Sequence, residues 1–543
     1  MQPNEKRIPH TLIVAAAAMA VYMIAHWQAF RSPFVINDDV RQQIFWMQQW
    51  LEPNIYPNDY LAGYARDYVS WGVIAIYRVA SLFMDPLQFT KVLTGILFVL
   101  SALLIYCLCL ELRDDLAALM GVCIYFLFGL FLGEMSGGLP RAFAFPLLIG
   151  YLCLLARKHL LLAAITVLVQ SIFIPYIFLL CLTTHLFYLA HLIGRSLVRH
   201  EADDSKTPTV RIAIQFIPLT IGACLMMLKY VVFKSPRFGS LVGMQEIAGK
   251  IEYTAVGRYE VLRPFHKELI EHWTFILPFH EWGPIAGWCS FAAVVGLAVF
   301  AISRPRKNIY PGAFRVFVYL MAASFILYVL SCSIPLKLFI PARYLEYSLT
   351  VFYCICLAAC LKIVIDHLNL KRIVFPWLFL FLTLLGALRL HNVELFDYSA
   401  YSPLYRFFDS TPVDAVVAGH PEVMDNVMTF SRRKAFVTYK LSHAWIQPYW
   451  SVIKQRTYDL FDAYYSNSAE QIRNFCKRNG IGYIVVREED FSEQRLREGK
   501  VYFQPFGSYI AEITRSRAGF AILDTDLFPP VFRMEGVRVV RID

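Results

Sequence analysis

The chain has 543 residues, of which 57% are hydrophobic and only 17% are charged, and its formal net charge is +10 at pH 7. An ordinary water-soluble fold is excluded, because apolar runs of membrane-spanning length recur from residue 11 to residue 390. The positive charge does not indicate nucleic-acid binding. The lysines and arginines fall largely in short loops between apolar runs, where they report topology.

The predicted membrane spans are runs of about 15 to 24 apolar residues, close to the length that a helix needs to cross a bilayer. The first run follows Lys6 and Arg7, and we interpret it as a retained span, because it is longer than a signal-peptide core and no small-residue cleavage site follows it. About eleven spans are predicted, at 11–30, 87–110, 115–133, 139–156, 160–174, 176–193, 210–231, 284–303, 314–333, 344–365 and 373–390.

The basic loops predict the orientation. The run 69–84 is apolar but short and contains Arg78. If this run is not a span and the N-terminus is cytoplasmic, every basic cluster of the short loops is cytoplasmic, as expected. These clusters contain Arg113, Arg157, Lys158, Arg195, Arg199, Lys206, Arg304, Arg306, Lys307, Lys371 and Arg372. We therefore predict that 69–84 is a helix at the outer interface, with Tyr68, Trp71 and Tyr77 at headgroup level.

Three segments are then predicted on the outer face: a first loop (31–86), a middle loop (234–283) and a C-terminal region (391–543). In the C-terminal region, strand-like and helix-like patterns alternate, which favours a small α/β layer. The strand patterns lie at 414–418, 434–439, 482–487 and 535–541, and the helix patterns at 448–464 and 468–479. The fold class is thus a polytopic α-helical membrane body (1–390) with a C-terminal soluble α/β domain (391–543) on the outer, periplasmic face.

That domain has no dinucleotide-binding, phosphate-loop or nucleophile-elbow motif. We therefore predict that it recognises an acceptor or covers a site on the membrane body. Its His420, His443 and Trp445 either face that site or pack in the domain core. In the middle loop, His266 is more typical of a solvated side chain. The aromatic residues of this loop either line a sugar or lipid groove or form an interfacial cover, and they include Tyr253, Tyr259, Phe265 and Trp273.

An acidic pair, Asp38 and Asp39, opens the first outer loop. Apolar residues recur at helical spacing after it, at Val40, Ile44, Met47 and Leu51, and predict an amphipathic helix resting on the membrane surface. In one interpretation, Asn37 caps this helix and the aspartates complement its dipole. In the other, a carboxylate faces a site at the membrane surface and takes a proton from an acceptor hydroxyl or amide.

With this motif the sequence resembles the GT-C superfamily, the polytopic glycosyltransferases that use polyprenyl-phosphate-linked sugars, such as aminoarabinose transferases and protein O-mannosyltransferases. Members have an Asp-Asp or Asp-Glu pair in the first outer loop, in some followed by Arg three residues after the first acid. Asp38, Asp39 and Arg41 match that pattern. The order of interfacial helices and of spans joined by a short charged cytoplasmic turn, here 111–115, is also similar. The resemblance covers most of the membrane body.

The resemblance implies a multi-pass enzyme of the inner (plasma) membrane that moves one sugar from a polyprenyl-phosphate donor to a glycan, lipid or protein, by general-base inverting transfer with or without a metal. Asp38 would deprotonate the acceptor, and Asp39 would orient the acceptor or a metal. Glu134 lies where several members place a second acid. It would assist Asp38 or join Asp39 in holding a divalent cation such as Mg²⁺ or Mn²⁺. In the other interpretation, Glu134 forms a surface pair with Arg141.

Basic residues on the outer side are candidates for binding the donor phosphate. The Arg141 guanidinium matches phosphate oxygens in a bidentate way, and Arg41 belongs to the acidic motif. Arg343 enters the tenth predicted span in a Pro-x-Arg-Tyr stretch similar to GT-C entries, with Lys337 nearby. In the alternative these residues extend to lipid headgroups, although the outside is the unfavoured side for positive charge.

Two other functions compete with this reading. A flippase or transporter of lipid-linked glycans typically has charges at mid-membrane depth or internal repeats, and neither is visible in the sequence. A surface-polysaccharide polymerase or ligase more often uses Arg and His in one large loop. Transfer of whole oligosaccharides to Asn is disfavoured, because the WWDYG motif of GT-C oligosaccharyltransferases is absent from the sequence.

Overall fold

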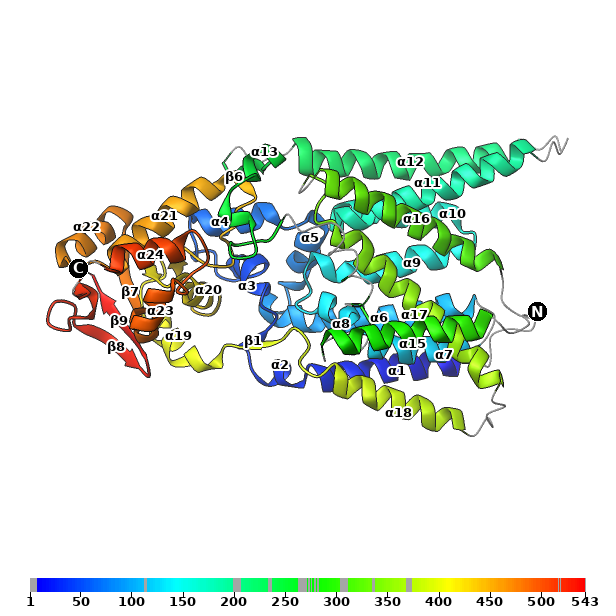
Figure 1. Cartoon of the computed structure of the whole chain (residues 1–543), viewed down its shortest axis with the longest axis horizontal. Helices are drawn as coiled ribbons and strands as arrows, with labels where there is room; N and C mark the ends of the chain where they lie inside the picture. The colour runs from blue at the N-terminus through cyan, green and yellow to red at the C-terminus, as the bar shows by residue number, and fades with distance from the viewer. Residues whose placement is uncertain are drawn as a thin grey trace.

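The computed structural model places a bundle of long helices at one end of an elongated molecule and a region that contains a β-sheet at the other (Figure 1). Helix α1 begins at Arg7 at the far end of the bundle, and the last strand, β9, lies in the sheet-containing region. The structure describes residues 7–111, 115–198, 207–232, 237–261, 271, 274, 276–277, 280, 283–302, 311–334, 337–367, 374–515, 517 and 519–542.

Within the described residues, five helices are long and apolar enough to cross a membrane. They are α6 (Pro86–Leu110), α11 (Pro175–Val198), α12 (Thr207–Met227), α16 (Pro311–Ser333) and α17 (Ala342–His367). A sixth forms if α7 (Asp115–Leu127) and α8 (Gly129–Met135), bent by 65°, count as one span. Shorter or less extended apolar helices complete the bundle, namely α1 (Arg7–Ala25), α9 (Ala144–Ala156), α10 (Leu160–Phe173), α15 (Pro284–Ile302) and α18 (Val374–Arg389).

Each predicted run coincides with one of these helices, so the chain is a multi-pass membrane protein. The count of spans and the cytoplasmic side of the N-terminus stay predictions.

Helix α5 (Trp71–Ala80) occupies the segment that the sequence analysis assigns to the outer interface. It has 10 residues, and a helix needs about 20 to cross a bilayer. It packs against α6 and α10. Just beyond its end, Leu82 and Phe83 are 72% and 85% exposed. Its short length fits an interfacial helix, and its position relative to lipid remains a prediction.

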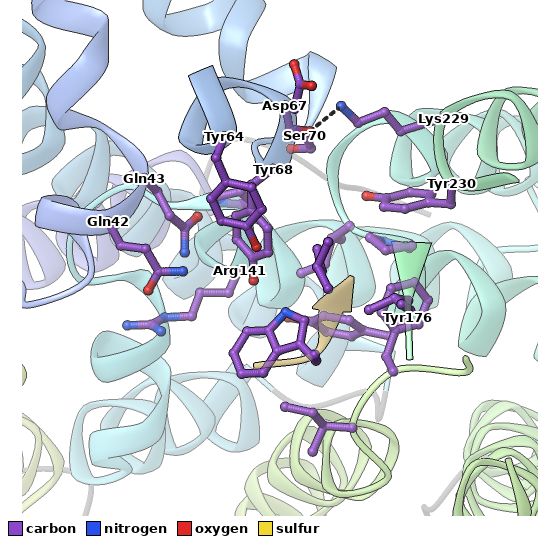
Figure 2. A pocket seen from close by; sticks show the side chains of 18 of the residues that line it. Gln42, Gln43, Tyr64, Asp67, Tyr68, Ser70, Arg141, Tyr176, Lys229 and Tyr230 are labelled. Carbon is purple, nitrogen blue, oxygen red and sulfur yellow. Dashed lines mark hydrogen bonds between the residues drawn. The ribbon is translucent and has the colours of Figure 1, made fainter. Parts of the chain in front are cut away.

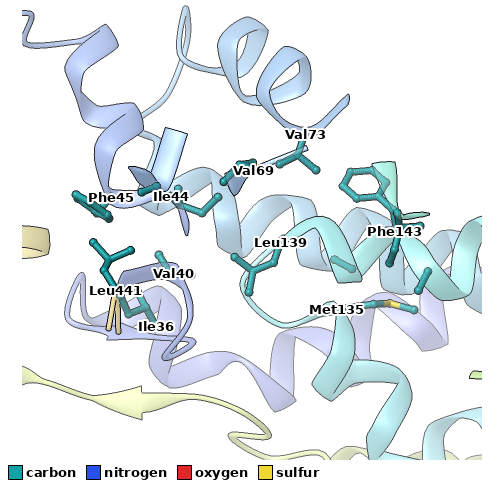
Figure 3. Packing of buried hydrophobic residues seen from close by; sticks show 14 of the residues in the cluster. Ile36, Val40, Ile44, Phe45, Val69, Val73, Met135, Leu139, Phe143 and Leu441 are labelled. Carbon is teal, nitrogen blue, oxygen red and sulfur yellow. The ribbon is translucent and has the colours of Figure 1, made fainter. Parts of the chain in front are cut away.

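The amphipathic surface helix predicted after Asp39 is wrong. The segment forms one turn, α3 (Val40–Gln43), followed by a 3₁₀ helix, η1 (Phe45–Trp50). Its apolar side chains Val40, Ile44 and Met47 are fully buried. Figure 3 shows Val40 and Ile44 packed between Leu441 on one side and Val69, Val73 and Leu139 on the other. Three of the four apolar positions are therefore covered by protein where the sequence suggested lipid, and only Leu51 is exposed.

The C-terminal region contains a five-stranded mixed sheet with the order β5-β4-β7-β9-β8. Parallel pairs join β4 to β5 and β7, and antiparallel pairs join β9 to β7 and β8. The strands are β4 (Val416–Gly419), β5 (Lys434–Ala435), β7 (Ile481–Arg487), β8 (Pro530–Met534) and β9 (Val537–Arg541). Strand β8 was not predicted, and β5 is shorter than its predicted run 434–439.

Six helices accompany the sheet: α19 (Ser402–Asp409), α20 (Pro421–Phe430), α21 (Tyr449–Tyr464), α22 (Ala469–Asn479), α23 (Glu493–Glu498) and α24 (Phe506–Arg515). The two helices predicted in this region are confirmed as α21 and α22. Gly480 ends α22 with φ +63°, a left-handed conformation that glycine adopts without strain.

Two small strand pairs join the C-terminal region to the outer loops. In the first, β1 (Val35–Ile36) pairs antiparallel with β3 (Phe396–Asp397). In the second, β2 (Gly239–Leu241) of the middle loop pairs antiparallel with β6 (Ile446–Pro448). A Cβ on Gly239 would lie 1.6 Å from the Gln447 carbonyl oxygen, so only glycine allows this close approach. The C-terminal region is thereby fixed onto both outer loops. The boundary near residue 391 stays a prediction.

Candidate functional site

A cavity of about 1000 Å³ lies where the end of the helix bundle meets the outer loops and the C-terminal region. Figure 2 shows Gln42, Gln43 and Arg141 on one side of Tyr64 and Tyr68, and Tyr176, Lys229 and Tyr230 on the other. Four of the predicted site residues line this cavity: Asp39, Arg141, Lys337 and Arg343. The other three predicted residues lie behind them: Glu134 contacts Arg141 and Arg343 directly, Asp38 reaches Asp39 through Lys440, and Arg41 contacts Asp38.

The bend between α7 and α8 places Glu134 near the end of α8, against the start of α17. Its Oε1 accepts a hydrogen bond of 2.9 Å from Arg343 Nη1, and its Oε2 accepts one from the Tyr347 hydroxyl. Arg343 Nη1 is also 3.2 Å from Glu346 Oε2. We call Glu134, Arg343 and Tyr347 the bundle half of the charged cluster, since α8 and α17 supply all three.

The two aspartates precede α3 in a tight turn. The Asn37 side-chain oxygen accepts a hydrogen bond of 3.0 Å from the Asp39 backbone N–H. Asn37 therefore stabilises the turn before α3. It is not the helix cap that one interpretation proposed, because Asp39 occupies the N-cap position of α3 and no side chain caps that helix. The Asp38 and Asp39 carboxylates, however, form ion pairs with basic side chains. Asp38 pairs with Arg41 and Lys440, whereas Asp39 pairs with Arg141 and with Lys440, whose Nζ is 2.9 Å from Asp39 Oδ1.

The C-terminal region completes this arrangement. The Tyr398 hydroxyl donates a hydrogen bond of 2.8 Å to Asp38, and Arg41 donates one of 2.7 Å to the Asn426 side-chain oxygen. The Arg41 guanidinium also lies 4.1 Å from the centre of the Tyr398 ring. We call Asp38, Arg41 and Lys440 the loop half of the cluster. Asp39 and Arg141 connect it to the bundle half, because Arg141 Nε is 3.8 Å from Glu134 Oε2.

Electrostatics keep these groups ionised. Burial raises the pKa of Asp38, but Arg41 and Lys440 outweigh burial and hold that pKa below its ordinary value. The pKa of Asp39 is likewise lowered, because Arg141 and Lys440 overcome the effect of burial. Burial lowers the pKa of Lys440, and the two aspartates raise it above its ordinary value. Losing one member would leave a poorly solvated charge without compensation, which typically costs about 3–5 kcal/mol for buried pairs.

Asp425 lies beneath the loop half and is buried. Its carboxylate oxygens accept hydrogen bonds of 3.0 and 3.2 Å from the Lys440 backbone N–H. Burial raises the pKa of Asp425 to about 7, although Arg41 and the Lys440 N–H oppose that change. Asp425 is thus an acid that changes charge near neutral pH directly behind ionised neighbours.

Sequence reasoning missed three members of the cluster: Lys440, Tyr398 and Tyr347. Lys440 could have been noticed as a lysine inside the largely apolar and aromatic stretch 435–446. Nothing in the sequence shows that it reaches Asp38 and Asp39, about 400 positions away. Tyr347 follows Arg343 by one helical turn, so it lies on the same face of α17.

The histidines and aromatic residues singled out in the sequence are not members of the charged cluster. His443 is buried and its Nδ1 is 2.7 Å from the Tyr64 hydroxyl, and His420 Nε2 is 3.0 Å from the Val501 carbonyl oxygen, so both pack. Trp445 lines the cavity, as Tyr259 does, whereas Tyr253 is buried. His266, Phe265 and Trp273 lie outside the described residues.

The residues predicted to hold a metal do not fit one in this arrangement. Among described residues, no three His, Cys, Asp or Glu side chains converge as metal ligands. Arg141 lies between Asp39 and Glu134 and contacts both, so a guanidinium supplies the positive charge where a cation would sit. A divalent cation therefore has no part in the steps derived below, and the metal assignment stays an untested prediction.

No protein-family model matches the chain, and no curated protein matches it. Among solved structures, the chain is similar to the oligosaccharyltransferase of Archaeoglobus fulgidus in the apo form, with a TM-score of 0.47, 13% identity, and coverage of 92% of this chain and 72% of that one. It is also similar to AglB of the same organism in complex with an inhibitory peptide and a dolichol-phosphate (TM-score 0.43, 11% identity, coverage 92% and 71%).

A third similar structure is ArnT from Cupriavidus metallidurans bound to undecaprenyl phosphate, with a TM-score of 0.41, 10% identity and coverage of 98% of both chains. At such identities the similarity says nothing of individual side chains, so the role of each residue has to follow from its own surroundings.

Proposed function

We propose that this protein is a membrane glycosyltransferase that moves one sugar from a polyprenyl-phosphate-linked donor to an acceptor at the outer, periplasmic face of the plasma membrane. One observation carries the proposal. A carboxylate, Asp39, and the cationic side chains Arg141, Arg343 and Lys337 line one cavity at the end of an apolar helix bundle. Glycosyl transfer from a lipid phosphate needs both kinds of group within reach of one sugar.

The bundle side of the cavity suits the donor. Apolar and aromatic residues lie there beside the cations, and Ile340 is 52% exposed next to Arg343 and Lys337. A polyprenyl phosphate likewise joins an anionic head to an apolar tail. The Arg343 guanidinium can bind phosphate oxygens in a bidentate way, and Lys337 or Lys229 can add charge at the cavity wall. The tail would then lie along the apolar wall formed by residues such as Tyr230 and Phe339.

In the proposed reaction, an acceptor hydroxyl attacks the anomeric carbon from the face opposite the phosphate. The new carbon–oxygen bond forms as the bond from carbon to phosphate oxygen breaks. The phosphate leaves with the bonding electrons, and Arg343 and Arg141 stabilise the charge that develops on it. The acceptor proton passes to a carboxylate. Because the transition state has oxocarbenium character, the hydroxyl becomes acidic as its bond forms, and a carboxylate of low pKa suffices.

We assign the proton-accepting role to Asp39 and a positioning role to Asp38. The resemblance suggested the reverse, with Asp38 as the base. Asp39 is the aspartate that lines the cavity, whereas Asp38 lies behind it and holds Arg41 and Lys440. Arg41 is buried against Asn426 and Tyr398, so its proposed role is to orient Asp38, in place of the phosphate binding suggested by the motif. Glu134 correspondingly orients Arg343 and Arg141.

The test is a transfer assay with the full-length protein in lipid nanodiscs and a panel of labelled polyprenyl-phosphate sugars. We expect transfer from at least one donor, and a loss of about 1000-fold in Asp39→Asn, the scale of a general base. Asp38→Asn should also reduce transfer strongly. Both variants should still bind undecaprenyl phosphate, which shows that they are folded, although their unfolding temperature should fall because each leaves a poorly solvated cation with less compensation. Asp459→Asn, on the surface of α21, is the matched control. Full activity of Asp39→Asn would refute its assignment, and no transfer from any donor would refute the function.

A further inference from the structure

Three polar side chains at the cavity have no hydrogen-bond partner among the described residues: Gln42, Gln43 and Tyr68. Gln42 is only 7% exposed, yet its side-chain amide has no hydrogen-bond partner among the described residues. Figure 2 shows the amides of Gln42 and Gln43 directed toward the space below Tyr64 and Tyr68. In contrast, neighbouring Gln48 and Gln49 both donate to backbone carbonyl oxygens.

Buried or half-buried amides such as those of Gln42 and Gln43 are normally satisfied, because leaving them without partners is costly. Tyr68 is 37% exposed and adds a hydroxyl at the same cavity. Gln42, Gln43 and Tyr68 line one part of the cavity. Backbone hydrogen bonds fix the positions of the two glutamines. The Gln42 and Gln43 N–H groups donate to the Asp39 carbonyl oxygen at 3.1 and 3.0 Å. The amides therefore follow Asp39 within one helical turn. Such an arrangement indicates a ligand that supplies both donors and acceptors beside the proposed base.

An aromatic wall completes the same part of the cavity. The Trp445 ring lies 4.0 Å from Tyr259 and stacks on the buried His443 at 4.5 Å. His443 in turn is hydrogen-bonded to Tyr64. The Arg258 guanidinium lies 4.3 Å from the ring centre of Tyr259 and donates hydrogen bonds to Tyr439. The cavity-lining rings are thus held from behind and present fixed apolar faces.

We propose that Gln42, Gln43, Tyr68 and Trp445 form a subsite for a sugar ring of the acceptor, so that the acceptor is a glycan. Ring hydroxyl groups both donate and accept hydrogen bonds, as amide side chains do. The C–H face of a pyranose can pack on an aromatic face such as that of Trp445. A ring bound here places a hydroxyl next to Asp39. The acceptor role rests on the proposed function, whereas binding of the ring does not.

The experiment measures binding of a panel of methyl pyranosides and short oligosaccharides to the full-length protein in nanodiscs, by saturation-transfer difference NMR with titration. We expect at least one sugar to bind. Gln42→Ala, Gln43→Ala and Tyr68→Phe should each weaken it about tenfold, the usual scale for a lost hydrogen bond to a ligand. Trp445→Phe tests the aromatic face with little risk to folding. Gln455→Ala, a surface glutamine of α21, is the matched control and should stay within about twofold of wild type.

Two results would overturn the subsite: no sugar of the panel binds, or binding is the same in all three polar variants. A peptide panel run in parallel gives a third, since peptide binding that depends on Gln42 and Gln43 would make the acceptor a protein. Lys337→Gln separates the donor site from the acceptor site, because it should weaken the binding of undecaprenyl phosphate and leave the binding of the oligosaccharide unchanged. If a bound oligosaccharide is instead displaced by a soluble sugar phosphate, the ring belongs to the donor and the proposal fails.

The outcomes also separate this inference from the proposed function. Sugar binding that depends on Gln42 and Gln43, without transfer from any polyprenyl-phosphate sugar, would refute the function and leave a carbohydrate-binding site. Transfer to a peptide or a simple lipid, without sugar binding, would leave the function and refute the subsite.

Discussion

The two halves of the charged cluster are built differently. In the bundle half, Glu134, Arg343 and Tyr347 come from α8 and α17, and their contacts need no residue of the C-terminal region. In the loop half, Asp38 and Arg41 are held by Lys440, Tyr398 and Asn426, all from beyond residue 391. The arginine proposed to receive the phosphate, Arg343, is therefore set by helix packing. The proposed base, Asp39, is held from both sides, by Arg141 and by Lys440 of the C-terminal region.

Among the changes that separate the two halves, the largest effect should come from breaking the loop half alone. Replacing Lys440 by Gln leaves Asp38 and Asp39 with less positive charge and raises the pKa of both carboxylates. We expect kcat to fall about 100-fold, with less than about twofold change in the KM for the donor, because the bundle half is intact. Lys440→Arg should recover part of the loss. Lys500→Gln, an exposed lysine of the same region, is the control. A large change in donor KM would show that the halves are not separable.

The converse change targets the bundle half. Arg343→Gln should raise the donor KM about tenfold and lower kcat, because a charge-assisted hydrogen bond to phosphate is lost. Arg343→Lys should restore only part of the donor affinity and of kcat, since an ammonium group cannot bind two phosphate oxygens in a bidentate way. Titration with undecaprenyl phosphate measures the binding component. Arg497→Gln, on the exposed face of α23, should match wild type. Wild-type donor affinity in Arg343→Gln would place the phosphate elsewhere.

A smaller effect is expected from Tyr398→Phe, which removes one hydroxyl. The Tyr398 hydroxyl donates to Asp38 at 2.8 Å, and its loss leaves Asp38 with Arg41 and Lys440. We expect kcat to fall about three- to tenfold, the scale of one ordinary hydrogen bond. The acidic limb of the pH–rate profile should move to slightly higher pH, a shift that purely structural damage would not produce. An unchanged profile would mean that Asp38 is not coupled to the base.

The last prediction concerns stability, not activity, and its dependence on pH. The pKa of Asp425 is raised to about 7 in the folded protein, against about 4 for an unfolded aspartate. Between those values the folded state keeps a proton that the unfolded state has lost. Stability should therefore fall as pH rises from about 4 to 7, by up to about 1.4 kcal/mol per pH unit. Asp38 and Asp39 have lowered pKa values, so their contribution to stability has the opposite pH dependence: it is lost as the pH falls below about 4.

Asp425→Asn should flatten this dependence. The test compares the unfolding temperature of the wild type and the variant in nanodiscs at pH 5, 6, 7 and 8. A wild-type slope that persists in Asp425→Asn would assign the titration to another group. Because Asp425 lies behind the loop half, the same series shows whether docking of the C-terminal region loosens at alkaline pH.

The helical body was largely predictable from the sequence, because a bilayer imposes long apolar runs that appear directly as composition. Each predicted run contains a helix, although several of these are shorter than a bilayer is thick. The helix predicted at 40–51 failed for a physical reason. Helical spacing of Val40, Ile44 and Met47 identifies a buried face but cannot say whether lipid or protein covers it.

The site was predictable in part. Motif and charge placement selected Asp38, Asp39, Glu134, Arg141 and Arg343, and the structure brings all five into one cluster. The role of Lys440 could not be predicted from the sequence, because it depends on the docking of a region that starts more than 350 positions after Asp39. Gln42 and Gln43 were not singled out, because in the sequence they are only polar residues between the apolar positions of the stretch 40–51. Their significance lies in the missing partners, which only three-dimensional packing reveals.

The pairing of β2 with β6 has a consequence for engineering this protein. The middle loop contributes Tyr259 and the C-terminal region contributes Trp445 to one wall, and the β2–β6 ladder holds these segments in register through Gly239. A chimera that exchanged residues 391–543 alone would put a foreign strand against Gly239 and separate the two rings. Acceptor preference should therefore be transferable between related proteins only when residues 238–261 move together with the C-terminal region.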